Sequence, residues 1–215
     1  MQLKNPLRTL NPPIKICKIC FKKVENLGLF ELLNQDFCLC EECREKFTPR
    51  FYKFLTCGHE TLCIYDYDEN MKKLLYQLKG CYDYELAIVF LEKYKRYLSI
   101  LYHGYILVPA PSYIEDDTAR GFNHVEEIFR CLNLPFAKLI DKRMHYKQSD
   151  HSFKNREDVK WILELKEDKQ MYGKKLLIVD DVYTSGSTAK TMVNLLEKLH
   201  PKEIKLLILS KTKKK

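Results

Sequence analysis

The sequence lacks any long hydrophobic run. The longest candidate, Tyr97 to Ile114, is interrupted by His103, Gly104, Pro109 and Pro111, and a membrane-spanning helix needs about 18 or more consecutive apolar residues. The first residues, MQLKNPLRTLNPP, contain no hydrophobic segment of the kind found in secretory signals. We therefore expect a cytoplasmic protein without a transmembrane segment. Peripheral association with the inner membrane is the alternative location.

The composition excludes a largely disordered chain. Hydrophobic residues make up 46% of the 215 positions and charged residues 31%, which is the balance of a globular protein with a sizeable core. Lys and Arg number 37 against 29 Asp and Glu, for a formal charge of +8. This excess favours anionic partners such as nucleic acids or phosphates. Part of it is local, because Lys211, Lys213, Lys214 and Lys215 form a basic end that is either a solubilising terminus or a binding arm.

Five of the nine cysteines lie between Cys17 and Cys43. Without a secretory signal, they point to thiols and metal rather than to disulfides. Cys17 and Cys20 form one C-x2-C knuckle, and Cys40 and Cys43 form a second after 19 intervening residues. Two such knuckles supply the four thiolates of a tetrahedral zinc site, so we predict structural zinc. Cys38 remains an alternative to Cys40 as a ligand.

The remaining cysteines give weaker signals. Cys57 and Cys63 can be seen as a metal half-site, but no second half follows. We prefer a hairpin with its turn at residues 58–61. Cys81 and Cys131 are expected to be small buried hydrophobic residues.

Residues 1–48 are predicted to form the cysteine module, and residues 49–215 a second domain that begins after Thr48 and Pro49. In the second domain helical and strand patterns alternate, which predicts an α/β fold with a mostly parallel sheet. The expected helices carry apolar residues within 71–78, 86–101, 125–132 and 192–199. The expected strands are 105–108, 137–140, 159–165, 176–179 and 204–209. Between them, residues 143–158 are polar and aperiodic, as in a functional loop.

The strongest chemical signal is LLIVDDVYTSGST, residues 176–188. A buried strand ends in Asp180 and Asp181 and leads through a hydroxyl-rich turn into a helix, whose N-terminus attracts anions. The turn and the first helical residues are Thr184, Ser185, Gly186, Ser187 and Thr188. The acids can accept hydrogen bonds from vicinal hydroxyls or help to hold Mg²⁺. No Lys follows the glycine, so this is not a P-loop, and the pattern favours a sugar phosphate over a plain turn with Ser187 as a helix cap.

The motif DDVYTSGST resembles the phosphoribosyl-pyrophosphate (PRPP) motif of type I phosphoribosyltransferases. The other motifs are similar to those of the ComF family of competence proteins: the two knuckles, Val108-Pro-Ala-Pro111, Arg120-Gly-Phe-Asn123, Gln148 and Arg156. The resemblance extends from Cys17 to Leu209. Ala110 stands where the family usually carries Val, and Cys38 lies beside an expected ligand.

The resemblance implies a type I phosphoribosyltransferase fold preceded by a small zinc-ribbon-like module. It implies that Asp180 and Asp181 bind ribose hydroxyls with Mg²⁺ and that residues 184–188 bind the 5′-phosphate. The pyrophosphate side would be formed by Ala110, Pro111, Ser112 and Arg120. Arg120 can instead be a helix-start charge before Gly121.

The polar stretch 143–158 would be the loop that closes over such a site and excludes water. In it, Lys147 and Arg156 would neutralise the departing pyrophosphate. Solvated charges on an ordinary loop are the competing interpretation of these two residues.

Three functions follow as hypotheses. The first is a phosphoribosyltransferase that transfers ribose 5-phosphate to an acceptor nitrogen, although no base-recognition signature is visible. The second, implied by the family, is a role in natural transformation, with incoming single-stranded DNA and other competence proteins as partners and PRPP or a nucleotide as ligand. The third, a zinc-ribbon adaptor on a silent scaffold, is disfavoured by the intact acid pair.

Overall fold

The computed structural model describes residues 15–24, 39–112, 114–146, 159–166 and 168–213. The chain divides into two compact units between Lys46 and Phe47, and each is described by itself below. No helix among the described residues has the length and hydropathy needed to cross a bilayer.

The N-terminal unit is held by a few short-range contacts. Residues 15–24 turn back on themselves through a bridge between Ile16 and Lys23 and a 2.9 Å hydrogen bond from the Cys17 amide to the Lys22 carbonyl. Phe21 adopts a φ of 58° at this turn. A single helical turn, α2 (Glu41–Glu45), begins directly after Cys40. Among residues 15–24 and 39–46, only Cys17, Leu39 and Cys43 are buried, so this part of the unit needs a further source of stability.

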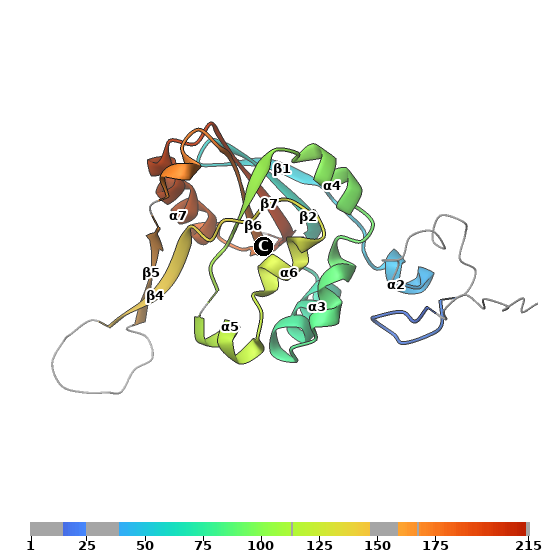
Figure 1. The fold of residues 1–215 in the computed structure, drawn as a ribbon. Coiled ribbons are helices and arrows are strands. Elements are labelled where there is room, and N and C mark those ends of the chain that lie inside the picture. Colours follow the sequence, from blue (N-terminus) through green and yellow to red (C-terminus); the bar gives the residue numbers. More distant parts are fainter. Residues whose placement is uncertain (1–14, 25–38, 113, 147–158, 167, 214–215) are drawn as a thin grey trace, which may run out of the picture. The chain divides into compact units, whose positions relative to one another are not determined.

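The larger unit is built on a five-stranded sheet of order β1-β2-β7-β6-β3 (Figure 1). Its strands are β1 (Tyr52–Thr56), β2 (His59–Asp66), β3 (Tyr105–Pro109), β6 (Lys175–Tyr183) and β7 (Glu203–Lys211). β2, β7, β6 and β3 pair in parallel, and only β1 runs antiparallel to its neighbour. The predicted mostly parallel sheet is therefore confirmed. The carboxyl ends of its four parallel strands meet at one edge, the position where open α/β sheets bind ligands.

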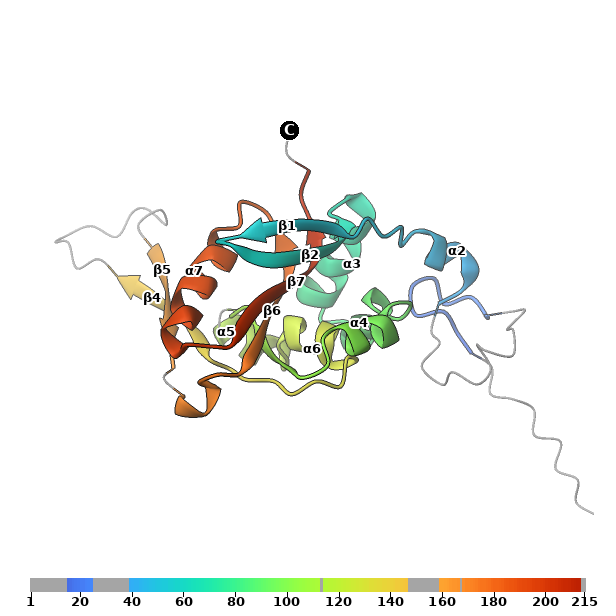
Figure 2. The same ribbon diagram turned by 90° about the horizontal axis from the view of Figure 1, so that it is seen from above.

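Helices cover both faces of this sheet. The helices are α3 (Glu69–Gly80), α4 (Lys95–Leu101), α5 (Ile114–Arg120), α6 (His124–Arg130) and α7 (Ser187–Leu196), with 3₁₀ helices at Tyr84–Phe90, Lys169–Met171 and Glu197–Leu199. Figures 1 and 2 show α7 on one side of the sheet and α3, α4 and α6 on the other. Leu176, Leu177, Ile178 and Val179 of β6 are all fully buried, as expected for a central strand covered on both faces.

A second sheet consists of two antiparallel strands, β4 (Ile140–Tyr146) and β5 (Val159–Leu165). In both views this ribbon projects from the larger sheet (Figures 1 and 2). The strand predicted at 159–165 is confirmed. The prediction for 137–140 is wrong in its bounds: β4 begins only at Ile140 and continues to Tyr146, so the first four residues of the predicted loop 143–158 belong to a strand. Residues 147–158 lie outside the described residues.

Three other predictions need correction. The hairpin between Cys57 and Cys63 is present, but its turn is Cys57-Gly58 rather than residues 58–61. Both turn residues have positive φ, 50° and 84°, as in the tight turns that match the twist of antiparallel strands. The predicted helix at 86–101 is divided into a 3₁₀ helix, Tyr84–Phe90, and α4. Finally, Cys81 is exposed and Cys131 is only partly buried, contrary to the expectation that both are buried.

Candidate functional site

The acid pair lies at the carboxyl end of the central strand. Asp180 and Asp181 are still within β6, which extends to Tyr183, and Asp180 is in register with Ile208 of β7. Successive residues of a strand point to opposite faces of a sheet. Asp181 consequently faces α3 and α6, whereas Asp180 lies on the α7 face of the sheet.

Asp181 is enclosed by two basic side chains from different helices. The Lys79 ammonium of α3 contacts its Oδ2, and Nε2 of His124 in α6 lies 3.5 Å from the same oxygen. The side chains of Asp181 and His124 are each only 9% exposed. A buried carboxylate is tolerated in this way because it is paired.

The two acids differ in their ionisation. Burial and the neighbouring Asp181 charge raise the pKa of Asp180 well above its ordinary value. Burial would also raise the pKa of Asp181, but His124 and Lys79 outweigh it and lower that pKa below its usual range. Asp181 is therefore the permanent anion of the pair. Asp180, whose Oδ1 accepts a 2.8 Å hydrogen bond from the Asp181 amide, is the acid whose protonation state a bound ligand can change.

The protonation of His124 follows from its neighbours. Arg120 Nη1 lies 3.2 Å from His124 Nδ1, and because a guanidinium can only donate, Nδ1 must be the acceptor. The ring proton is then on Nε2, where it is directed at Asp181. Burial lowers the pKa of His124, although the hydrogen bond to Asp181 acts in the opposite direction. We conclude that His124 is a neutral donor at pH 7.

The Arg120 side chain lies within a hydrogen-bonded cluster and does not extend into solvent. Its side chain is 8% exposed. Its Nε donates to the Lys79 carbonyl at 3.1 Å, and its Nη1 donates to Asp117 at 3.1 Å. It is the last residue of α5, so the expectation that it marks a helix start is wrong.

Asn123 connects the same cluster to the strand end at β3. Its Nδ2 donates to Ser112 Oγ at 2.7 Å and to Asp117 Oδ2 at 2.8 Å, while its Oδ1 caps α6 by accepting from the Glu126 amide at 3.0 Å. The Arg120–Asn123 motif thus ties β3, α3, α5 and α6 together. It also orients His124 toward Asp181.

The hydroxyl-rich loop leads directly into α7. Thr184, Ser185, Ser187 and Thr188 are exposed, and Ser185 Oγ donates to Ser187 Oγ at 3.0 Å and accepts from its amide at 3.3 Å. Gly186 is the N-cap of α7 with a φ of 76° and without a side-chain cap. The first amides of a helix have no intrahelical partner, so this loop offers hydroxyl and N–H donors to an anion.

Gly186 is required here for a second reason. A Cβ at this position would collide with the hydroxyl and ring of Tyr183. The Tyr183 ring also packs edge-on against Phe54 of β1, with 5.1 Å between centroids, and its hydroxyl lies 3.4 Å from Thr56 Oγ1. Tyr183 therefore fixes the loop against the sheet.

The structure places the other predicted site residues as follows. Ala110 is buried and its amide donates to the Val179 carbonyl at 2.8 Å, while Pro111 and Ser112 are partly exposed. Ala110, Pro111 and Ser112 follow β3, the neighbour of β6, so both predicted halves of the ligand site share one sheet edge. The predicted loop residues Lys147 and Arg156 lie outside the described residues.

Lys79, His124 and Asp117 are the residues that the sequence did not reveal. His124 directly follows the Arg120–Asn123 motif, so its place in the sequence was a usable signal. Lys79 carries no such signal, because it is one of 37 Lys and Arg residues and meets Asp181 only through the tertiary fold.

The basic end is more ordered than a frayed terminus. Lys211 belongs to β7, and its ammonium lies 4.9 Å from the Phe54 ring centroid. Lys213 forms an ion pair of 3.4 Å with Asp66. Both lysines therefore have partners within the larger unit, and Lys214 and Lys215 lie outside the described residues.

The four predicted zinc ligands come together in the N-terminal unit. The Sγ atoms of Cys17, Cys20, Cys40 and Cys43 all lie within 4.8 Å of one another, and those of Cys20 and Cys40 are 3.6 Å apart. Four thiolates at about 2.3 Å from a tetrahedral zinc ion would be about 3.8 Å apart. The cluster can thus hold a metal ion. Cys38 lies outside the described residues.

One of these thiols is already disposed to ionise. Burial would raise the pKa of Cys17, but backbone hydrogen bonds from Cys20, Cys40 and Ile19 lower it to about 7. A metal ligand must be a thiolate. The backbone of both knuckles therefore stabilises the ligand form of Cys17.

Comparisons with known proteins agree with this architecture. Residues 118–215 match the phosphoribosyl transferase domain family. The chain is 26% identical to "Competence protein ComFC" of Streptococcus pneumoniae over 88% of its length and 96% of that protein. It is also 26% identical to the Bacillus subtilis protein of the same name, over 83% of its length and 76% of that protein.

Among solved structures, a purine phosphoribosyltransferase from Pyrococcus horikoshii is 22% identical, over 58% of this chain and 70% of that one, with a TM-score of 0.35. The resemblance to ComF-type competence proteins is confirmed by the matches along most of the chain. The expected fold class is confirmed as well: a type I phosphoribosyltransferase sheet with an N-terminal cysteine cluster.

Proposed function

We propose that the larger unit binds phosphoribosyl pyrophosphate at the carboxyl edge of its sheet and acts there as a phosphoribosyltransferase. The observation that carries this proposal is the order of three features along the chain from β6 to α7. An acid pair at the strand end is followed by an exposed hydroxyl loop and by a glycine N-cap with a φ of 76°. A carboxylate that accepts from sugar hydroxyls, next to a helix N-terminus that receives a phosphate, suits a phosphorylated sugar.

Each predicted residue then has a task in binding. Thr184, Ser185, Ser187 and Thr188, together with the Gly186 amide, would hold the 5′-phosphate. Asp180 would accept hydrogen bonds from the ribose hydroxyls. Asp181, kept anionic by Lys79 and His124, would stabilise positive charge that develops on the ribose in the transition state.

The pyrophosphate side would be formed by the segment after β3 and by the arginine cluster. Ser112 is positioned by Asn123, and Ala110 and Pro111 shape the strand end. Arg120 would act from within its hydrogen-bonded cluster, as a nearby positive charge. Lys147 and Arg156 remain predicted partners of the departing pyrophosphate.

Magnesium would enter with the pyrophosphate. This ion commonly binds to one or two carboxylates plus substrate phosphates and keeps several waters. Asp180 meets this requirement, whereas Asp181 is already engaged by Lys79. Zinc in the cysteine cluster would serve stability alone, because four thiolates leave no open position for a substrate.

At the level of the cell, we propose a role in natural transformation. The chain would handle incoming single-stranded DNA in the cytoplasm, with other competence proteins as partners and with the inner membrane as a peripheral docking surface. The support is the similarity to two proteins named for competence, together with the formal charge of +8. The alternative is a conventional phosphoribosyltransferase for a nucleobase. Release of pyrophosphate with a free nucleobase would favour that alternative.

The direct test is calorimetric titration of PRPP with Mg²⁺ into the wild type and Asp180→Asn. We expect the variant to bind at least about tenfold more weakly, because one of the two carboxyl oxygens that can accept from ribose hydroxyls or bind Mg²⁺ is replaced by an amide NH₂. It should also unfold at a higher temperature than the wild type, since a destabilised acid is removed. Loss of affinity therefore cannot be ascribed to misfolding.

Asp168→Asn is the matched control. Asp168 caps the 3₁₀ helix Lys169–Met171 through the Gln170 amide at 2.9 Å, and Asn caps helices as well as Asp does. Its affinity for PRPP should equal that of the wild type. Equal affinity in Asp180→Asn and the wild type would refute the ligand assignment.

A further inference from the structure

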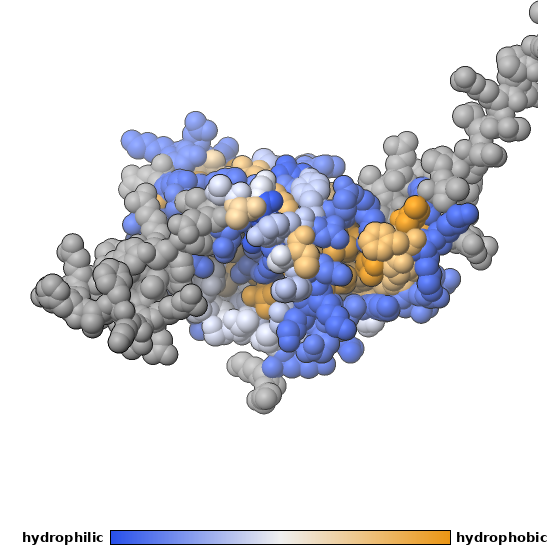
Figure 3. Space-filling view, turned by 90° about the horizontal axis from the view of Figure 1, so that it is seen from below, coloured by the Kyte–Doolittle hydropathy of each residue, from blue (hydrophilic) through white to orange (hydrophobic). Residues whose placement is uncertain are grey.

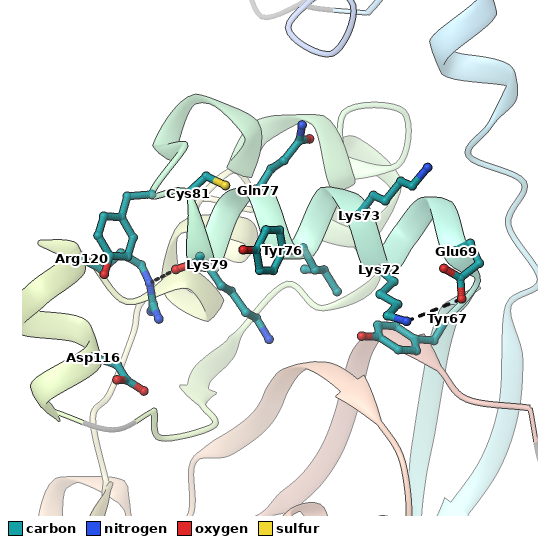
Figure 4. Close-up of a pocket in the computed structure, with 13 residues that line it drawn as sticks. Tyr67, Glu69, Lys72, Lys73, Tyr76, Gln77, Lys79, Cys81, Asp116 and Arg120 are labelled. Atoms are coloured by element: carbon teal, nitrogen blue, oxygen red, sulfur yellow. Dashed lines mark hydrogen bonds and ion pairs between the residues drawn. The ribbon is translucent and has the colours of Figure 1, made fainter.

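A groove runs along α3 beside the acid pair, with a volume of about 820 Å³. Figure 3 views the larger unit from the side on which α3 and α5 lie, and most of this face is hydrophilic with hydrophobic residues between. The groove is lined by residues from α3, from the segments just before and after it, and from α5, and Figure 4 labels most of them. Lys79 is part of this lining, and its ammonium contacts Asp181.

Lys72, Tyr76 and Lys79 share one stripe of α3, because their spacing of four and three residues brings them to the same side of a helix. In Figure 4 Lys72 and Lys79 extend to the side of α3 opposite Lys73 and Gln77, and the Tyr76 ring lies between them in front of the helix. The stripe thus extends outward from Asp181.

Tyr76 is an exposed but restrained aromatic surface. Its side chain is 68% exposed. A Cβ at Gly80, one turn later, would lie 3.0 Å from Cε2 of Tyr76, so the ring rests on the bare backbone of that glycine. Restraint matters because an immobilised ring loses little conformational entropy when a ligand stacks on it. Tyr67 and Tyr82 line the same groove.

The charge of the groove is positive. Its lining includes four cations, Lys72, Lys73, Lys79 and Arg120, but only two acids, Glu69 and Asp116. Lys72 is 60% exposed, and its ion pair with Glu69 is long at 3.7 Å, so its charge remains available to a ligand. Lys79 pairs with Asp181, and Arg120 is held in its cluster.

We infer that the α3 groove binds a nucleotide unit, with the base stacked on Tyr76 and its phosphate beside Lys72. Stacking on an exposed aromatic ring combined with neighbouring cations is the general way in which proteins hold unpaired nucleotides. This inference rests on the proposed handling of single-stranded DNA and assigns it a site. Lys79 of the groove lining contacts Asp181, so a strand lying in the groove would pass close to Asp181.

The test measures binding of a labelled oligothymidine of about twenty nucleotides by fluorescence anisotropy, without PRPP. We expect Tyr76→Ala to bind about tenfold more weakly, while Tyr76→Phe keeps the ring and binds as the wild type does. Lys72→Glu should weaken binding several-fold and should flatten the dependence of affinity on salt. Competition with thymidine monophosphate distinguishes a free nucleotide from a strand as the natural source of the ligand.

Two control variants isolate the groove. Tyr172→Ala removes a tyrosine that is 49% exposed and stacks on His200, beyond the groove lining. Lys198→Glu makes the same change of charge as Lys72→Glu at an exposed position of the 3₁₀ helix Glu197–Leu199. Both should bind the oligonucleotide as the wild type does.

The possible outcomes separate the groove from the wider proposal. If the wild type binds the oligonucleotide and the groove variants bind equally well, the assignment to α3 is wrong and the DNA role stands. If the wild type binds neither probe, both are overturned. If only the monophosphate binds and Tyr76→Ala abolishes that binding, the groove is a nucleotide site and the DNA role is refuted.

Discussion

The cysteine cluster and the carboxyl edge of the sheet are assembled in opposite ways. The four thiols come from two short knuckles, each closed by local hydrogen bonds such as the one from the Phe21 amide to the Cys17 carbonyl. The acid site takes Asp181 from β6, Lys79 from α3 and His124 from α6, which meet only when the whole sheet has formed. The first site is set by spacing along the chain, and the second by tertiary structure.

This difference separates two sources of stability. Among its described residues the N-terminal unit buries only Cys17, Leu39 and Cys43, so a bound metal ion would supply most of its free energy of folding. The larger unit has a continuous core around β6 and α7. We therefore expect that the first unit depends on its ligand for folding and that the second does not.

The largest effect is expected from removing the metal. Cys43→Ser, or a strong chelator, should unfold residues 1–46, because structural zinc contributes on the order of 10 kcal/mol in small modules. The larger unit should keep its thermal unfolding midpoint. Zinc content and limited proteolysis measure the first effect, and calorimetry measures the second.

Cys57→Ser is the control for this experiment, since Cys57 is an exposed thiol in the β1–β2 turn. It should retain one zinc per chain. Simultaneous unfolding of both units in Cys43→Ser would show that the division into independent units is wrong.

A smaller effect is expected at the glycine before α7. Gly186→Ala should destabilise the larger unit by about 2 kcal/mol or more, because alanine is strained at a φ of 76° and its Cβ meets Tyr183. Urea unfolding measures the change. Weaker binding of PRPP should accompany it.

Gly173→Ala isolates the contact with Tyr183. Gly173 also has a positive φ, 67°, but a Cβ there would have no neighbour within 4 Å. Gly173→Ala should therefore lower the free energy of unfolding only by the cost of the backbone strain. If both variants lose the same stability, the contact between Tyr183 and residue 186 is unimportant.

The smallest effect is a dependence of stability on pH. The pKa of His124 is lowered by burial, so the folded state favours the neutral ring. The contribution of His124 to the free energy of unfolding is then fully present at pH values above its pKa in the unfolded state, about 6.5. This contribution is lost as the pH falls through the lower pKa of His124 in the folded state.

His124→Gln should flatten this part of the pH profile between pH 7 and 5, because glutamine keeps a donor without titrating. Urea unfolding at a series of pH values measures it. This part of the pH dependence comes from His124 only if the profiles of the wild type and the variant differ. Identical profiles would therefore contradict the neutral state assigned to His124.

The sequence predicted the elements with strong local signals. The buried run at 176–179, the hydroxyl loop before α7 and the paired knuckles all depend on neighbours in the chain, and each is present in the structure. The hairpin at Cys57–Cys63 was predicted for the same reason, although its turn is shorter than expected.

The failures have a common physical cause. Residues 143–146 are polar and look like a loop, yet they form a strand because Val159–Leu165 offers them backbone partners. Lys79 belongs to no motif in the sequence, yet its ammonium contacts Asp181 of β6. In both cases the deciding partner is distant in sequence, so no local pattern could identify it.

The end of β7 has a practical consequence. Lys211 is in register with Tyr183, and the Thr212 amide donates to the Tyr183 carbonyl at 3.1 Å. Thr212 therefore lies one strand away from the loop that begins at Thr184, and a purification tag fused to this end of the chain would be attached close to that loop. The tag could then change the ligand affinity measured on such a fusion. Protein from which the tag has been cleaved is the suitable reagent.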